Sequence, residues 1–460
     1  MKKSGVILLA LTSLLVFGSS FNAMAAEGWT MVNGSWVFYE SDGDRATNVW
    51  KKGADDLWRY LDSNGNMALN TWVEDTYYVD ANGILTTDKW LKLRAPGWSS
   101  YDDDEYGWYY FGSSGKAISD TWKKINNKWY YFDSDGKMQT GWLEDTYYLG
   151  EGEDGVMRTG WQYLKDPTDD DEDDYITPGD EGDDGHHWYY FGSNGKKYVP
   201  EFDSGQEYGI IKIEKNYYCF DSNGAMQTGW KNVSEDPDSR DISDYRFFGE
   251  ANDGKMRTGW LYYQGPDEVT GSMFDTESQW YYFGTNGIPK VGPKEGQAST
   301  SDLVRINGIT YLFNEYGNPV YGLQNVEGYA YYFGNDTQLS MQTGKQKVEE
   351  GDGSECMYYF TESGSNKGRG YTGVKDDYLY FNGKRQDAGD SRYMIVTIPT
   401  NSGDVTYVVN STGKVQKNKT VTDSYGTKYK GNARGILSKV DNEDATDGDT
   451  GEPILPNYPY

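Results

Sequence analysis

The sequence is poor in the residues that build catalytic centres, metal sites and aliphatic cores. It has only two histidines among 460 residues, and its hydrophobic residues amount to 36%. His186 and His187 are adjacent, and no second cluster completes a metal site or a catalytic triad, so we expect both in an exposed loop. We also find no glycine-rich phosphate loop and no nucleophile elbow. These absences argue against an enzyme and against a bound metal or cofactor.

Basic residues are also scarce. The chain carries 43 Lys and Arg against 72 Asp and Glu, a formal net charge of -29. Binding to nucleic acid requires basic patches that meet phosphates, so we exclude nucleic acid as a partner. The acidic surface favours solubility and a cationic ligand or counter-ion.

Long apolar runs are absent after the first residues of the chain. Residues 1–25 have the pattern of a secretory signal peptide, with Lys2 and Lys3 before an apolar stretch and Ala23 and Ala25 at a small-x-small cleavage site. The stretch is too short to cross a bilayer comfortably, and no later segment is apolar enough to do so. We therefore expect an exported protein without a membrane span or a covalent anchor.

Aromatic residues and glycine are abundant instead. Aromatics make up 16% of the chain, with 16 Trp and 42 Tyr, and there are 57 Gly. A disordered chain would be poor in aromatics. The composition therefore indicates many short strands joined by glycine turns, with a core made of rings.

These residues recur as a repeat of about 20 residues, with insertions. One unit runs from Trp122 through the aromatic quartet 129–132 and the turn at Gly136 to Met138 and Trp142. Further units close at Trp161, Trp230 and Trp260, and similar quartets recur at 108–111, 188–191 and 280–283. We expect each quartet to form a strand, the Asp-Ser-Asp-Gly136 segment to turn, and the Met138–Trp142 segment to be the returning strand.

A lone hairpin is marginal in water, whereas stacked copies bury their rings between neighbours. The sequence therefore predicts an all-β fold, a solenoid of tandem β-hairpin repeats. Because each unit of such an array contacts mainly its neighbours, Cys219 and Cys356 should remain free thiols.

The repeats resemble the choline-binding, or cell-wall-binding, repeats of Gram-positive bacteria, which are related to the glucan-binding repeats of secreted glucosyltransferases. The resemblance covers most of residues 28–390. Together with the composition of the two ends, it predicts four parts of the chain. These are a signal peptide at 1–25, repeats at 26–390 with acidic insertions near 94–107 and 165–187, degenerate repeats at 391–440, and a flexible acidic, proline-containing tail at 441–460.

The resemblance also implies choline cages between successive hairpins. Each cage takes the Gly-Trp tryptophan and the strand tryptophan of one repeat and a tyrosine of the next. The groups carried over are Trp122, Trp129 and Tyr147; Trp50, Trp58 and Tyr77; Trp90, Trp108 and Tyr130; Trp161, Trp188 and Tyr218; Trp260, Trp280 and Tyr311; and the variant Trp230, Tyr245 and Tyr281.

Some repeats depart from this pattern. Thr76, Thr146 and Ala330 replace the strand tryptophan in three of them, so their own cages should be incomplete. The group begun by Trp29 and Trp36 meets Arg59, a cation at the wall of a cation site.

Aromatic cages suit a trimethylammonium group because it donates no hydrogen bond and is attracted by ring faces. We therefore expect a secreted, non-catalytic protein attached non-covalently to the cell wall, docking on choline-substituted teichoic or lipoteichoic acid. Three alternatives stay open: a lectin-like module for glucan or host glycan, an adhesin, and purely structural packing of these rings. The acidic insert at 166–185 offers oxygen ligands for calcium but lacks the spacing of a known loop, which favours a solvated surface.

Overall fold

The computed structural model describes most of the chain after residue 26, and its regular structure is almost entirely β-strand. It divides into a first compact unit, residues 1–186 with 190–198, and a second, residues 187–189 with 199–460. The predicted signal peptide and most of both acidic insertions lie outside the described residues. The described ranges are 27–97, 106–167, 185–250, 252–270, 277–294, 296–400, 402–441 and 451–459.

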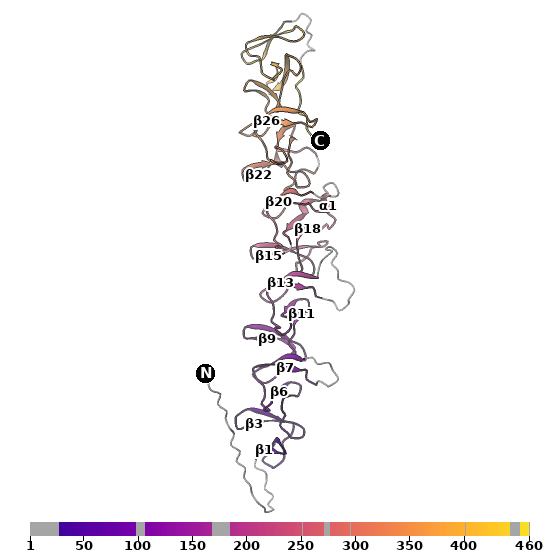
Figure 1. Cartoon of the computed structure of the whole chain (residues 1–460), viewed down its shortest axis with the longest axis vertical. Coiled ribbons are helices and arrows are strands. Elements are labelled where there is room, and N and C mark those ends of the chain that lie inside the picture. The colour runs from indigo at the N-terminus through magenta and orange to yellow at the C-terminus, as the bar shows by residue number, and fades with distance from the viewer. Residues whose placement is uncertain are drawn as a thin grey trace, which may run out of the picture. The chain divides into compact units, whose positions relative to one another are not determined.

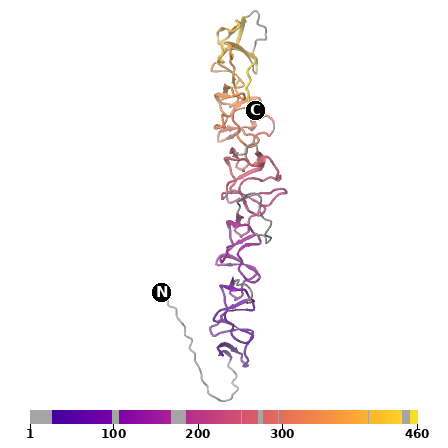
Figure 2. The same ribbon diagram turned by 45° about the vertical axis from the view of Figure 1, so that its right-hand side comes forward.

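The first unit consists of successive antiparallel hairpins that follow one another in chain order (Figures 1 and 2). The paired strands are β1 (Gly28–Val32) with β2 (Ser35–Tyr39), β3 (Val49–Lys52) with β4 (Trp58–Leu61), β5 (Thr71–Val73) with β6 (Tyr77–Val79), β7 (Lys89–Arg94) with β8 (Tyr106–Phe111), β9 (Thr121–Ile125) with β10 (Lys128–Phe132), and β11 (Gly141–Leu143) with β12 (Tyr147–Leu149). The strand β13 (Gly160–Lys165) follows, and β14 (His186–Phe191) contributes residues to both units.

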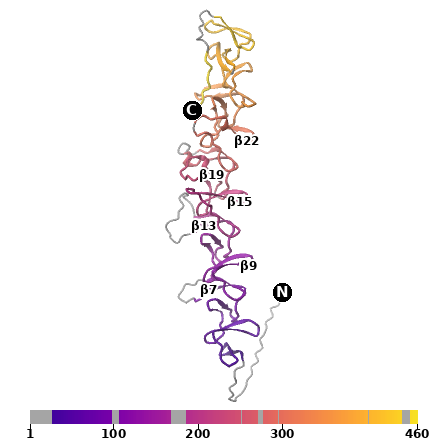
Figure 3. The ribbon, with the colours of Figure 1, turned by 180° about the vertical axis from the view of Figure 1, so that it is seen from behind.

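The second unit continues the hairpin plan and ends in larger sheets (Figures 1 and 3). Its two-stranded sheets are β18 (Gly229–Asn232) with β19 (Tyr245–Phe248), β20 (Gly259–Tyr263) with β21 (Gln279–Phe283), β22 (Val304–Ile306) with β23 (Ile309–Tyr311), β24 (Leu323–Val326) with β25 (Tyr329–Tyr332), and β31 (Tyr393–Thr400) with β32 (Gly403–Asn410). Larger sheets join β15 (Gly209–Ile213), β16 (Asn216–Phe220) and β17 (Met226–Gln227); β26 (Gly344–Glu349), β27 (Glu355–Phe360), β30 (Lys384–Arg385), β29 (Tyr378–Phe381) and β28 (Gly373–Lys375); and β33 (Thr420–Thr422), β34 (Lys428–Gly431) and β35 (Leu437–Asp441). Short helical turns are α1 (Asp267–Thr270), η1 (Ile242–Asp244) and η3 (Thr300–Asp302).

The structure confirms an all-β hairpin fold but pairs the strands differently from our expectation. The aromatic strand β10 pairs with the preceding Gly-Trp strand β9, so that Tyr131 lies opposite Trp122. The hairpin turns at Asn126 and Asn127, whose φ angles of 49° and 67° are both positive, as in a type I′ turn. The Met138 segment, predicted to be the returning strand, makes only an isolated bridge to Phe132.

The predicted glycine turn after each aromatic strand is confirmed. Gly136 has a φ of 79°, a region that glycine enters without steric cost, and its N–H donates to the carbonyl of Asp133 at 3.0 Å. The Asp133 carboxylate accepts two more backbone bonds, from Asp135 at 3.0 Å and from Lys137 at 2.8 Å. This turn leads each repeat out of its aromatic strand toward the next Gly-Trp strand.

After this turn the chain bonds back to the preceding hairpin, which fixes the stacking of neighbours within a unit. The N–H of Met138 donates to the carbonyl of Trp108 at 2.8 Å, and that of Met157 donates to the carbonyl of Trp129 at 2.9 Å. In the second unit the N–H of Met341 donates to Thr310 at 2.9 Å. A hydrogen bond from the methionine N–H to the carbonyl of a residue on the aromatic strand of the preceding hairpin thus recurs along the chain.

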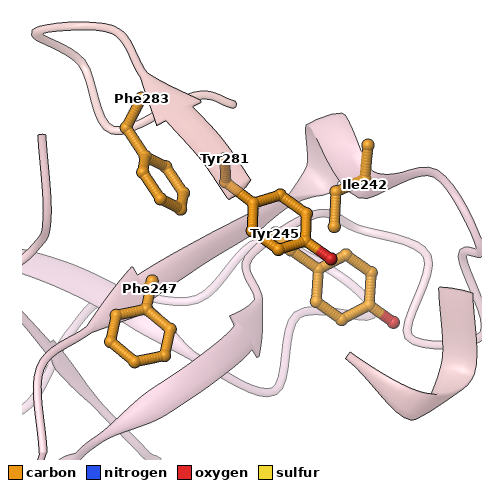
Figure 4. Packing of buried hydrophobic residues seen from close by; sticks show 5 residues of the cluster. All are labelled: Ile242, Tyr245, Phe247, Tyr281 and Phe283. Carbon is orange, nitrogen blue, oxygen red and sulfur yellow. The ribbon is translucent and has the colours of Figure 1, made fainter. Parts of the chain in front are cut away.

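Rings fill much of the core, as the aromatic composition predicts. The largest fully buried side chains are tyrosines and phenylalanines. Figure 4 shows one cluster of the second unit, formed by Ile242, Tyr245, Phe247, Tyr281 and Phe283. Aliphatic side chains contribute more than the composition suggested, because another cluster of this unit consists of Leu379, Val396, Ile398, Val409 and Val415.

The end of the chain differs from the expected flexible tail. Residues 451–459 dock on the second unit, and Figure 1 shows the C-terminus beside β26. The side-chain amide of Gln386 donates to the carbonyl of Ile454 at 2.9 Å and accepts from its N–H at 2.7 Å. Tyr458 packs against the core cluster around Tyr358. These reciprocal bonds and the partly buried ring give this proline-containing segment fixed partners that its composition does not reveal.

The expectation for the two cysteines is confirmed, whereas the expectation for the two histidines is wrong. Both cysteines are free, Cys219 being buried and Cys356 partly buried. His186 and His187, expected in an exposed loop, lie partly buried on β14 instead, and the His186 ring stacks on Tyr163 at 5.6 Å. Among the described residues, no helix is long and apolar enough to cross a bilayer.

Candidate functional site

Tryptophans at the start of the hairpins fall into two classes. In the first class the indole N–H donates to a backbone carbonyl at or just beyond the end of a later strand, at 2.8–2.9 Å. We call these the tethered tryptophans; the pairs are Trp29 with Lys52, Trp72 with Arg94, Trp142 with Lys165, and Trp230 with Gln264. The bond satisfies the polar edge of the ring, as buried indoles require.

The second class has no such tether. Within the described residues, the indole N–H of these tryptophans donates to no backbone carbonyl, and each ring instead stands against a tyrosine of the following hairpin. We call them the open tryptophans. The ring centroids lie 5.3 Å apart for Trp50 and Tyr77, 5.0 Å for Trp90 and Tyr130, 4.9 Å for Trp122 and Tyr147, and 5.0 Å for Trp260 and Tyr311.

The tyrosine of the following hairpin separates the classes further. Against the tethered Trp72 and Trp230 stand Tyr109 and Tyr281, both with 0% exposure. The corresponding tyrosines of the open class are all partly exposed. A ligand can therefore reach the ring faces of the open class, whereas buried tyrosines close the rings of Trp72 and Trp230.

The strand tryptophans of the open hairpins complete these groups. Trp58, Trp129 and Trp280 are 44%, 41% and 41% exposed. Each lies two register positions from the open tryptophan of its hairpin, on the same face of the sheet, because side chains alternate between faces. The structure thus brings the predicted groups of Trp50, Trp122 and Trp260 together as exposed clusters.

A basic side chain lies directly opposite the strand tryptophan in two of these hairpins. Lys52 is opposite Trp58, with its Nζ 5.4 Å from the ring centroid, and Lys124 is opposite Trp129 at 6.0 Å. These amines lie where an exogenous cation would bind the ring, so they compete with it.

The Trp260 group replaces that lysine with an aromatic residue. Tyr262 lies opposite Trp280, and their centroids are 5.1 Å apart. Trp280 stands perpendicular to Trp260, at 90° and 6.0 Å, and Tyr311 meets Trp260 at 63°. Rings at such steep angles form the walls of a corner. Tyr262 was missed from the sequence, although its place two residues after Trp260 marks the same face of a strand.

A pocket of about 490 Å³ adjoins this group in the second unit. Its aromatic lining is Tyr262, Trp280 and Tyr321, and its carboxylates are those of Glu277 and Asp336. No basic side chain is among its lining residues. Rings and carboxylates together attract a cation, by ring faces and by charge.

The remaining predicted groups have other surroundings. Trp90, Trp108 and Tyr130 come together, with Trp90 and Trp108 at 6.4 Å, but the Trp108 indole N–H is buried without an acceptor among the described residues. Trp161 packs against Tyr190 at 5.1 Å within the first unit.

Two predicted groups are not seen as exposed clusters. Trp188 and Tyr218 belong to the second unit, where the Trp188 indole donates to Asn252 at 3.0 Å. The variant group is part of the core, because Tyr245 and Tyr281 are 3% and 0% exposed. Both side chains are drawn in Figure 4. Burial raises the pKa of Tyr245 to about 12. A ligand would have to open this core to reach the rings.

The surroundings of Tyr130 favour its neutral form. Burial, and secondarily the carboxylate of Asp154, raises the pKa of Tyr130 above its usual value. Among the described residues, no group of three or more His, Cys, Asp and Glu side chains is placed to hold a metal ion. The chemistry offered is therefore that of ring faces and carboxylates.

Comparisons with known proteins agree with the repeat pattern. Residues 26–72 and 119–161 match a family described as "Choline-binding repeat", and residues 184–197 and 275–288 match one described as "Putative cell wall binding repeat". Within the choline-binding repeat family, the match at 26–72 includes Trp50 and Trp58, and the match at 119–161 includes Trp122, Trp129 and Tyr147.

Individual relatives are distant. Glucosyltransferase-S of Streptococcus mutans is 25% identical over 223 residues, which are 47% of this chain and 14% of that enzyme. Among solved structures, the Streptococcus pneumoniae protein CbpJ is 24% identical with a TM-score of 0.37, covering 66% of this chain and 98% of that one.

The modular autolysin LytC from Streptococcus pneumoniae is 20% identical with a TM-score of 0.38, covering 64% of this chain and 52% of that chain. The chain thus spans about half the length of the autolysin and a small part of the glucosyltransferase. The recurrent motif and the two family matches together show that this chain carries repeats of the choline-binding, cell-wall-binding family.

Proposed function

We propose that this chain is a secreted, non-catalytic protein that docks on choline groups of a cell-wall polymer, such as choline-substituted teichoic or lipoteichoic acid. One observation carries the proposal. The group of Trp122, Trp129 and Tyr147 lies entirely within a matched choline-binding repeat, and its rings are reachable from solvent. The groups of Trp50 and Trp260 have the same architecture.

The energetics of a ring cluster favour repetition. A cation–π contact contributes about 0.5–2 kcal/mol, so three rings give roughly millimolar binding after the cost of immobilisation. Several such groups on one chain, facing a polymer with many cholines, gain by effective concentration, about 100-fold or more. The net charge of -29 adds a general attraction for cations.

The working sites should be those of the open tryptophans. Their tyrosine partners are partly exposed, while those of Trp72 and Trp230 are closed by the core. The pocket beside Trp280, with its two carboxylates and no opposing lysine, should bind the cation most tightly.

A column experiment tests the proposal. The mature chain is loaded on a choline resin, and we expect free choline to release it while glucose and salt do not. The double variant Trp129→Ala, Trp280→Ala should elute at a lower choline concentration. Tyr425→Ala, which removes a ring that is 89% exposed and outside these groups, is the matched control and should elute like the parent.

A glycan is the second candidate ligand, favoured by the similarity to glucosyltransferase-S over 223 residues. Sugars also pack on Trp and Tyr faces. Retention on dextran with no effect of choline would support this candidate and contradict the first one. Turnover of peptidoglycan by the purified chain would contradict the non-catalytic assignment.

A further inference from the structure

The first hairpin differs from the other tethered hairpins at two positions. Its strand β2 carries Trp36, a 40% exposed ring, where two of them carry Thr76 and Thr146 and the Trp230 hairpin carries the buried Tyr245. The position that the Tyr109 ring fills against Trp72 is held by Arg59 in the hairpin that follows Trp29. The Trp36 ring is therefore present as an additional wall, and the tyrosine ring that would fill the space against Trp29 is missing.

The Arg59 side chain does not replace the missing ring, because a carboxylate holds it in place. Its Nη1 and Nη2 donate to the two oxygens of Asp55 at 2.8 and 2.7 Å, a bidentate pair, and Nη1 also donates to the carbonyl of Leu57 at 3.2 Å. The Trp29 indole is fixed by its bond to Lys52, which leaves the ring face as its remaining surface. The guanidinium and the indole are thus both held before any ligand arrives.

The result is a pocket of about 350 Å³ within the first unit. This volume falls inside the range of about 300–1,000 Å³ that small-molecule sites occupy, and an aromatic lining with a few polar groups is typical of such sites. The lining residues are Trp29, Trp36, Gly53, Ala54, Asp55, Arg59, Met67 and Asn82.

The charge of this pocket differs from that of a cation cage. Arg59 and Asp55 neutralise each other, and the hydrogen bonds from Arg59 hold the pKa of Asp55 well below its usual range, so the pair stays ionised. The pair carries no net charge, so it gives the pocket no preference for an ionic ligand of either sign.

The polar groups are of mixed type. A guanidinium has five N–H groups, and the contacts within the described residues occupy three of those of Arg59, leaving two donors. The Asp55 carboxylate has further lone pairs that accept, and the Asn82 amide at the rim both donates and accepts. Donors and acceptors beside two indole rings match a molecule with adjacent hydroxyls and an apolar C–H face.

We propose that this pocket binds one neutral hexopyranose unit of a glycan, with the sugar ring on the Trp29 and Trp36 faces and its hydroxyls on Arg59, Asp55 and Asn82. The site is chemically distinct from the open groups. It does not depend on choline recognition at Trp122 or Trp260, so either proposal can fail alone.

The test uses the full mature chain with nitrogen-15 in its tryptophan indoles, whose N–H signals are assigned by single substitution. The probes are methyl glucoside, methyl galactoside, N-acetylglucosamine and N-acetylgalactosamine, each titrated separately, followed by choline chloride and sodium phosphate. We expect at least one glycoside to shift the Trp29 and Trp36 signals with a Kd of about 1 mM, while choline and phosphate do not.

Two variants separate binding from folding. Arg59→Tyr restores the ring that other repeats carry and should abolish the glycoside shifts. Trp36→Thr introduces the residue found at Thr76 and Thr146, and should weaken glycoside binding at least tenfold with the other indole signals unchanged. Shifts of Trp29 and Trp36 by choline or phosphate alone, or by none of the glycosides at tens of millimolar, would overturn the proposal.

Discussion

The contrast between tethered and open tryptophans predicts opposite effects of substitution at Trp72 and Trp129. Trp72→Phe removes a partly buried hydrogen bond of 2.9 Å to Arg94 and leaves its carbonyl without that donor. Such a bond contributes about 0.5–1.5 kcal/mol, and the smaller ring loses further contact with Tyr109, so we expect a loss of about 1–3 kcal/mol in local stability. Choline binding should be unchanged.

Trp129→Ala should show the reverse. The ring is 41% exposed, so its removal should change stability by less than about 1 kcal/mol. The loss of one ring face at about 0.5–2 kcal/mol weakens choline binding at that group by about 2–30-fold.

Site-resolved measurements are needed to see both effects. A repeat array need not unfold in one step, so stability is read from hydrogen exchange of the β5, β6 and β7 amides around Trp72 and of the β9 and β10 amides around Trp129. Choline affinity is read from an indole signal of the same group, because the other groups mask the loss on a column. Unfolding of the first unit by Trp129→Ala, or loss of choline binding in Trp72→Phe, would refute the division into two classes.

Three further predictions follow from individual contacts. Lys124→Ala removes a cation 6.0 Å from the Trp129 ring and should raise choline affinity there about twofold to fivefold, measured by titration at low salt. Burial raises the pKa of Tyr458 to about 12 from 10.0, so tail docking should be full below pH 10 and weaken as the pH rises through 12, measured by limited proteolysis. Iodoacetamide should label Cys356 first and the buried Cys219, whose thiol pKa is raised by burial, only on unfolding.

Each of these has its own control. Lys123 is on the same strand but on the opposite face, directly opposite Tyr130 in register, and Lys123→Ala should leave choline affinity at the Trp129 ring unchanged. An equal gain in both lysine variants would show that net charge, not ring competition, is responsible. Tyr458→Phe should keep the tail docked at high pH; release at the same pH as the parent would contradict the role of this phenol. Equal labelling rates of both thiols in the folded chain would contradict the burial of Cys219.

The sequence predicts the fold class and the partners of the ring groups because both depend on short, repeated motifs. Trp122 and Tyr147 were paired across two hairpins from spacing and resemblance alone, and their rings lie 4.9 Å apart. Gly136 was assigned to a turn from its type and neighbours, and its positive φ agrees. These features are local or are repeated between neighbours.

Other features depend on contacts that no motif records. The hairpin partner of β10 is β9, because Asn126 and Asn127 form the tight turn. The Asp-Ser-Asp-Gly136 turn follows β10 instead, so the partner strand predicted after it was wrong. The hydrogen bond from Trp72 to Arg94 could not be predicted, because such a prediction requires knowing where the following strand ends. The docking of the tail on Gln386 joins residues far apart in sequence, which composition cannot show.

The most direct test of the central claim is a crystal structure of the mature chain grown with choline. We expect trimethylammonium density enclosed by Trp122, Trp129 and Tyr147 and beside Trp280, with none against Trp72 or Trp230. Density against the tethered rings, or open groups that stay empty at saturating choline, would contradict it.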